Sequence, residues 1–174
     1  MDELVEAALR KWPNVPHCWG WLALDGRGDW YMRDERVQAA GPFPRVKGSR
    51  IRHEKLLGFI HRNYAADADG AWFFQNGPQR VYVELEAAPW VWRVQRERLP
   101  AVTSHTGLPA TVQGAWLDEA GRLFLHTERG LGLVHSLDME EAADAIEAGQ
   151  WPEPQSLPFA QMPQRFGYRL NPAP

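Results

Sequence analysis

The stretch KGSRIRHEKLLGFIHRNYAADADGAWFFQNGPQRVYVELEAAPWVWRV, residues 47–94, decides the fold of this chain. Its first part is a basic loop that leads into an amphipathic helix over about 50–64, for which Ser49 is the expected N-cap. Its second part alternates apolar and polar residues, as a half-buried strand does, and Asn76-Gly77 supplies the positive φ of a tight hairpin turn. The stretch therefore predicts a helix followed by a three-strand meander, with strands at 71–75, 80–86 and 90–94.

The flanking sequence continues the same pattern of hairpins and helices. Upstream, we expect a short helix at 2–11, a strand hairpin over 19–33 and a loop over 34–48 that is rich in Gly and Pro. Downstream, we expect strands at 114–117, 123–127 and 132–136, an acidic helix at 139–148 capped by Asp138 or Ser136, and an extended Pro-rich tail from Trp151.

These elements predict an α+β fold of antiparallel β-hairpins and meanders with two main helices. The spacing W-x4-G recurs at Trp21, Trp72 and Trp116, each at the start of an expected strand that enters a glycine turn, which suggests two related halves. The expected organisation is an N-terminal α+β half at 1–97, a C-terminal meander and helix at 98–150, and a tail at 151–174 packed on the body.

The composition favours a cytoplasmic globular protein. Of the 174 residues, 44% are hydrophobic and 24% charged, so the chain can bury a core. The single Cys18 excludes an internal disulfide, and neither a basic leader nor a membrane-length apolar run is present. The net charge of -3 argues against a general polyanion binder. We expect no membrane association, no cofactor and no metal.

The order of motifs resembles an uncharacterised proteobacterial family of unknown function. The matching segments are LALDGRGDWY at 22–31, GSRIR at 48–52, and DGAWFFQNGPQRVYVELEAAPWVWRV at 69–94. The family pattern is DGxWYYxGSPIxR, a helix, then DGxYFLxxPxEKxxIxVEDAPF. This chain departs from it in a long loop at 34–47 and in having Arg50 where the family has Pro. The resemblance implies an α+β fold with internal repeats and a signalling role through ligand or protein binding.

The basic entry to the long helix is the main candidate site. Lys47, Ser49, Arg50 and Arg52 lie before or at the expected helix N-terminus, where free N–H groups and the helix dipole favour an anion. A phosphate, a carboxylate or an acidic peptide fits this chemistry. The alternative is a solvated helix face, because exposed ion pairs are common and weak.

The hairpin after the helix carries a second candidate. Gln79 and Arg80 place amide and guanidinium donors beside the Asn-Gly turn, which suits recognition of a carboxylate or a peptide backbone. Trp90 and Trp92 share one face of their expected strand, so they are candidates for an aromatic wall beside these donors, or for core residues.

Catalytic and metal motifs are incomplete throughout. His17 and Cys18 are adjacent and point to opposite faces of an extended chain, and His53 and His61 are too far apart on one helix to share an ion. Asp67-Ala-Asp69-Gly70 begins like a calcium loop but lacks the later oxygen ligands.

We therefore predict a non-enzymatic protein that binds a small anionic ligand or an acidic protein segment in a regulatory role. The first alternative is an enzyme whose acid and base groups, such as His53, Asp25 or Glu84, meet only in the fold. A single-stranded nucleic-acid binder is the weaker alternative, because 130–164 contains no Lys or Arg. A homodimer is compatible with the pattern.

Overall fold

The computed structural model describes all 174 residues, and the fold is α+β, as the sequence predicts. The chain divides into two compact units. Unit 1 contains residues 1–25, 29–86 and 168–174, and unit 2 contains residues 26–28 and 87–167. Unit 1 therefore includes both ends of the chain.

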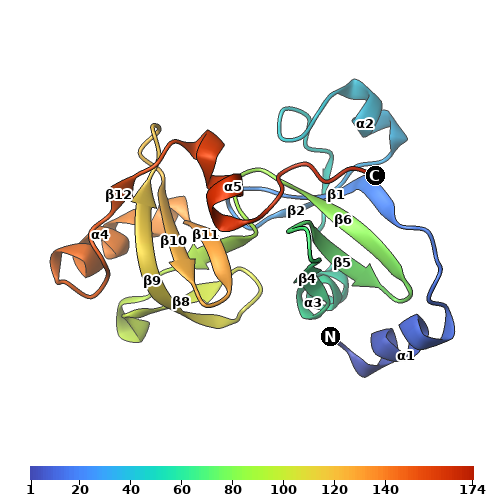
Figure 1. Cartoon of the computed structure of the whole chain (residues 1–174), viewed down its shortest axis with the longest axis horizontal. Helices are drawn as coiled ribbons and strands as arrows, with labels where there is room; N and C mark the ends of the chain where they lie inside the picture. The colour runs from blue at the N-terminus through green and yellow to red at the C-terminus, as the bar shows by residue number, and fades with distance from the viewer. The chain divides into compact units, whose positions relative to one another are not determined.

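Unit 1 is built on a six-stranded sheet. Its strands are β1 (Cys18–Leu24), β2 (Trp30–Met32), β3 (Ser49–Arg50), β4 (Tyr64–Ala66), β5 (Trp72–Asn76) and β6 (Gln79–Leu85), in the order β3-β2-β1-β6-β5-β4. All of them except β3 are labelled in Figure 1. All neighbours are antiparallel except β1 and β6, which run parallel and pair Leu22 with Val83 and Leu24 with Leu85. This long-range pairing places the two longest strands of the sheet at its centre.

Three helices belong to unit 1: α1 (Glu3–Lys11), α2 (Glu35–Ala40) and α3 (Glu54–Arg62). Helix α3 lies against β5, where the Phe59 ring meets the Phe74 ring edge-on at 5.4 Å between centroids. Ile60 on the same helix is 1% exposed. The apolar stripe of the helix therefore covers one face of the sheet, as amphipathic spacing requires.

Unit 2 is a small closed barrel. Its strands are β7 (Trp90–Arg93), β8 (Ala101–Ser104), β9 (Pro109–Leu117), β10 (Leu123–Thr127), β11 (Gly130–Val134) and β12 (Gln155–Ser156). Their order is β10-β11-β7-β8-β9-β12, and β10 also pairs with β9, so five strands close on themselves and leave no free edge between them. Helices α4 (Met139–Glu147) and α5 (Met162–Phe166) belong to the same unit.

Four hairpins share one turn design. In each, an Asp or Ser is followed three residues later by a glycine whose φ lies between 76° and 92°, a conformation that favours glycine. In the β9–β10 turn, the Asp118 carboxylate accepts the N–H groups of Ala120 and Arg122 at 3.0 and 2.8 Å. Side-chain acceptors of this kind replace backbone partners in tight turns. The turns are Asp25–Gly28, Asp67–Gly70, Ser104–Gly107 and Asp118–Gly121.

The structure corrects several predicted elements. The long helix begins at Glu54, and Ser49 and Arg50 form β3. The expected loop at 34–48 contains α2, and the expected third strand of the meander, β7, pairs with β8 and β11 in unit 2. Asp138 does not cap α4 through its side chain, because its carboxylate binds Arg93 and the Val94 N–H.

The tail and the unit boundaries also differ from the expectation. Residues 151–167 contain β12 and α5 in unit 2, whereas 168–174 belong to unit 1, and the units meet in sequence between 86 and 87 rather than at 97. The sheet orders of the two units differ, one being open and the other closed. Two related halves therefore stay a prediction, supported only by the shared turn design.

Candidate functional site

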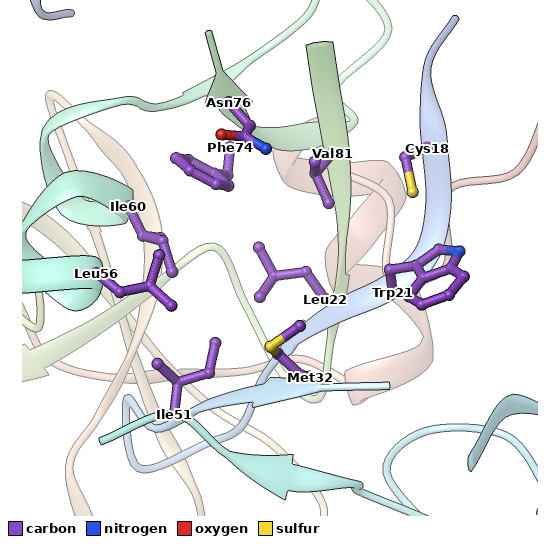
Figure 2. A pocket seen from close by; sticks show the side chains of 10 residues that line it. All are labelled: Cys18, Trp21, Leu22, Met32, Ile51, Leu56, Ile60, Phe74, Asn76 and Val81. Carbon is purple, nitrogen blue, oxygen red and sulfur yellow. The ribbon is translucent and has the colours of Figure 1, made fainter. Parts of the chain in front are cut away.

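An apolar pocket of about 230 Å3 lies in unit 1 between α3 and the central strands. Figure 2 shows Leu56 and Ile60 of α3 facing Leu22 of β1, with Phe74 of β5 above them. The pocket is also lined by Cys18, Trp21, Met32, Ile51, Asn76 and Val81. Pockets for drug-sized ligands usually span about 300–1,000 Å3, and a dry cavity of about 150 Å3 takes benzene. This pocket therefore suits one bulky apolar group.

The rim of the pocket leaves large apolar side chains in solvent. Trp21 on β1 is 37% exposed and Met32 on β2 is 51% exposed. Burying such surface is favourable at roughly 25 cal/mol per Å2. The two side chains extend the apolar surface beyond the pocket itself.

Two cations that flank the pocket in sequence have no acidic partner. Arg52 follows the lining residue Ile51, and Lys55 precedes the lining residue Leu56. Both are exposed, and neither forms an ion pair. Their charge is therefore not neutralised by an acid of the chain.

The other predicted cations are already paired. Lys47 contacts the buried carboxylate of Asp25 at 3.2 Å and Glu86 at 3.8 Å, and Arg50 contacts Asp29 at 2.8 Å. Ser49 is exposed on β3 and does not cap a helix. The N-cap of α3 is His53, whose Nδ1 accepts the Leu56 N–H at 3.2 Å. Arg52 is thus the one member of the predicted helix-entry site that has an unpaired charge.

Lys47, Asp25 and Tyr31 form a network on the sheet. The Tyr31 hydroxyl donates to Asp25 at 3.1 Å, and burial together with the Asp25 charge raises the pKa of Tyr31. Burial acts to lower the pKa of Lys47, but its hydrogen bond and attraction to Asp25 outweigh burial, so this pKa is raised. Tyr31 therefore stays neutral and Lys47 stays charged. Neither group is tuned to exchange a proton near neutral pH, so the network is structural.

Gln79 and Arg80 lie far from the helix entry. Across the sheet, Arg50 is opposite Tyr31, Tyr31 is opposite Ala23, and Ala23 is opposite Glu84. Arg80 lies four residues before Glu84, which is about 13 Å along β6, and β6 lies three strands from β3, about 14 Å away. The fold therefore does not bring the two predicted groups of donors together.

The local contacts of these two residues are structural. The Arg80 guanidinium lies 4.2 Å from the centre of the Phe73 ring and contacts the Tyr82 hydroxyl at 3.5 Å. The Gln79 side chain donates to the Pro16 carbonyl at 3.2 Å. Both side chains hold the start of β6 in place.

The expected aromatic wall is corrected by the burial of its two members. Trp90 and Trp92 are 5% and 0% exposed in the barrel of unit 2, with their rings stacked at 5.9 Å. Their indole N–H groups donate to the carbonyls of Arg129 and Leu125. They are core residues and present no surface to a ligand.

The acid and base groups of the enzyme alternative lie in different surroundings. Burial raises the pKa of Glu84 despite its hydrogen bond from Asn171. Asp25 is in the network described above, and His53 forms no hydrogen bond with either carboxylate. No group of three or more His, Cys, Asp and Glu side chains is placed to hold a metal ion.

Comparisons with known proteins identify the family. The family model DUF2944, described as "Protein of unknown function (DUF2946)", matches residues 1–173. The chain belongs to this family. No curated protein matches this DUF2944 chain.

Two solved structures of the DUF1285 family are similar to it. The protein from Silicibacter pomeroyi DSS-3 has a TM-score of 0.51 at 15% identity and covers 83% of this chain and 84% of its own. The protein from Shewanella baltica OS155 has a TM-score of 0.49 at 17% identity and covers 71% of this chain and 91% of its own. The first of these supports the fold alone. No helix of the DUF2944 chain is long and apolar enough to span a membrane.

The pocket was not predicted as a site. Leu22 and Val81 were expected in strands, but their approach depends on the parallel pairing of β1 with β6, which no local pattern encodes. Trp21 is one of several tryptophans expected in strands, and its 37% exposure is seen only in the structure.

Proposed function

We propose that this protein is a binding module without catalytic activity, whose ligand combines an apolar group with a negative charge. The ligand is a small anionic molecule or an acidic segment of a protein, and binding it serves a regulatory role. The observation that carries the proposal is the apolar pocket flanked in sequence by the unpaired cations Arg52 and Lys55.

The chemistry of the lining supports binding over catalysis. Leu22, Leu56, Ile60 and Phe74 offer contact surface and no group that can attack a substrate or transfer a proton. The one reactive atom at the pocket is the Cys18 sulfur, and burial raises the pKa of its thiol. A thiol held in its protonated form is a poor nucleophile.

Straight-chain carboxylates of increasing length provide the direct test. Binding to the full chain, measured by calorimetry, is expected to strengthen with each added methylene, by up to about 0.8 kcal/mol, until the pocket is filled. Bound carboxylate is also expected to slow alkylation of Cys18 by N-ethylmaleimide, because this single cysteine lines the pocket.

A pocket-filling substitution and a charge reversal with a matched control assign the binding to this pocket. Val81→Phe, or Leu56→Phe if the first fails to fold, fills the pocket and should abolish the dependence on chain length. Arg52→Glu with Lys55→Glu should weaken binding, whereas Arg98→Glu with Arg165→Glu, which makes the same charge change at exposed unpaired sites of unit 2, should not. Length-independent binding that all variants retain contradicts the proposal.

A further inference from the structure

We propose that the occupant of the pocket is an acidic peptide segment of a partner protein, which inserts one bulky apolar side chain between α3 and β1. This inference rests on the proposed function and names the class of its ligand. The partner is defined by chemistry: a leucine-sized or phenylalanine-sized anchor with acidic residues beside it.

The composition of the rim favours a protein partner. Trp, Met and Arg are the residue types enriched at protein interfaces, and hot spots form where an apolar anchor enters a pocket. Trp21 and Met32 border this pocket with 37% and 51% of their surface exposed, and Arg52 follows its lining residue Ile51. A volume of about 230 Å3 accommodates one such anchor.

The surface beyond Trp21 favours a peptide over a simple alkyl chain. Trp21 also lines a second, open depression of about 300 Å3 at the start of α2, where the other lining residues are Asp34, Glu35 and Arg36. Neither Glu35 nor Arg36 forms an ion pair, so both remain available for polar contacts. An alkyl chain has nothing to offer these polar groups, whereas an acidic peptide that crosses Trp21 presents backbone N–H groups to the Glu35 carboxylate and a carboxylate to Arg36.

The unpaired cations of unit 1 favour acidic residues beside the anchor of the peptide. Lys47 and Arg50 are neutralised within unit 1 by Asp25, Glu86 and Asp29. Arg52 and Lys55 are not, so carboxylates next to the anchor complement them and steer association.

The probes are fluorescein-labelled peptides of sequence Glu-Asp-X-Glu-Asp, with X as Leu, Phe or Ala, and Lys-Lys-Leu-Lys-Lys as the reversed-charge control. Fluorescence anisotropy with the full chain is expected to show the Leu and Phe peptides binding at least about tenfold more tightly than the Ala peptide. Arg52→Glu with Lys55→Glu should remove this binding, and Arg98→Glu with Arg165→Glu should leave it intact.

Trp21→Ala tests the path across the rim, because it removes the side chain shared by both depressions while the pocket floor stays in place. It should weaken the Leu peptide more than it weakens octanoate. Equal binding of the Leu and Ala peptides, or binding that ignores the Arg52 and Lys55 changes, overturns the inference. If octanoate binds in the pocket and no peptide does, only this inference falls. If neither binds, the proposed function falls as well.

Discussion

At the scale of single residues, the basic stretch before α3 contains cations with opposite roles. Lys47 and Arg50 hold unit 1 together through Asp25 and Asp29, whereas Arg52 has its charge in solvent. The sequence alone does not distinguish these three cations, since each is a basic residue in the same short run. Only the positions of the acids, which lie between β1 and β2, separate a paired cation from an unpaired one.

The Lys47 network leads to a prediction about stability. Lys47→Met leaves the Asp25 carboxylate, 3% exposed, without its lysine partner, and should lower the free energy of unfolding by about 1–2 kcal/mol. Arg50→Met removes a more exposed pair and should cost less than about 1 kcal/mol. Urea unfolding of both variants measures the difference. Equal losses would mean that burial of Asp25 does not matter.

His61 should make stability depend on pH near neutrality. Its Nε2 accepts the Trp30 indole N–H at 3.0 Å, and burial lowers its pKa below the usual 6.5. The unfolded chain therefore takes up the proton first, so the free energy of unfolding falls as the pH drops below about 6.5.

His61→Gln provides the test, because glutamine offers an acceptor to Trp30 but does not titrate in this range. The variant should lose less in melting temperature than the wild type between pH 7 and pH 5. Some loss should remain, since burial also lowers the pKa of His126 in unit 2. Identical pH profiles for variant and wild type would exclude His61 as the source.

At the scale of elements, the shared Asp or Ser turn is the most regular feature of the fold. It joins β1 to β2 and β4 to β5 in unit 1, and β8 to β9 and β9 to β10 in unit 2. Asp67-Ala-Asp69-Gly70, which begins like a calcium loop, is one of these turns. Its Asp67 carboxylate is occupied by two N–H groups and by the Tyr82 hydroxyl.

Removing one such carboxylate should destabilise its hairpin. Asp118→Ala leaves the N–H groups of Ala120 and Arg122 and the Arg122 side chain without their acceptor, and should cost about 2 kcal/mol. Asp69→Ala is the control, because the Asp69 side chain is exposed and accepts no hydrogen bond, so its cost should stay within about 0.5 kcal/mol.

The Asp118 contribution should also disappear in acid. Burial acts to raise its pKa, but the N–H groups and Arg122 outweigh burial, so the pKa is lowered from 3.8. The stabilisation is therefore present above about pH 4 and lost as the pH falls through the folded pKa. The difference in urea midpoint between wild type and Asp118→Ala should narrow below that pH. A difference that is constant with pH would contradict the assignment.

The sequence predicted elements with local signals and missed those with long-range causes. Asn76-Gly77, the apolar stripe of α3 and the alternation in β6 are local, and these elements are present. The pairing of Ser49–Arg50 with β2 depends on a partner in a distant segment, so a capping residue and a short edge strand look alike in sequence. The partners of β7 are also invisible in sequence. Its residues look like the third strand of a meander, but the strand pairs with β8 and β11 in the barrel.

The candidate site was predictable only in part for the same reason. The basic run predicts Arg52 as a site residue, because charge is visible in sequence. The pocket itself depends on the bulged parallel register that places Cys18 opposite Val81 and Leu22 opposite Val83, and on Ile51 from the far edge of the sheet. The sequence places Trp21 in a strand, but neither the exposure of its side chain nor the pocket beside it is visible there.

At the scale of the whole molecule, unit 1 depends on residues from the end of the chain. The Leu85 N–H donates to the Leu170 carbonyl at 2.8 Å, and the Arg169 N–H donates to the Gly70 carbonyl at 3.0 Å. The Asn171 side chain bonds to the Glu84 carboxylate. These contacts tie the last residues to β6 and to the turn before β5.

Deleting residues 168–174 should therefore loosen unit 1 and spare the barrel. Hydrogen exchange measured by mass spectrometry is expected to show faster exchange in β5 and β6 of the truncated chain, with β9, β10 and β11 unchanged. Unchanged protection of β6 would show that these hydrogen bonds contribute nothing to unit 1.

Unit 1 is interrupted in sequence by residues 87–167 of unit 2, so its parts are synthesised at different times. A ribosome releases the segment 29–86 long before it adds 168–174, and at about 5–20 residues per second the interval is on the order of ten seconds. During that interval the barrel segment 87–167 emerges with its closing strands complete. Unit 1 thus begins before the barrel and is completed after it, and until residues 168–174 are added the Leu85 N–H and the Glu84 carboxylate of β6 lack their partners from that segment.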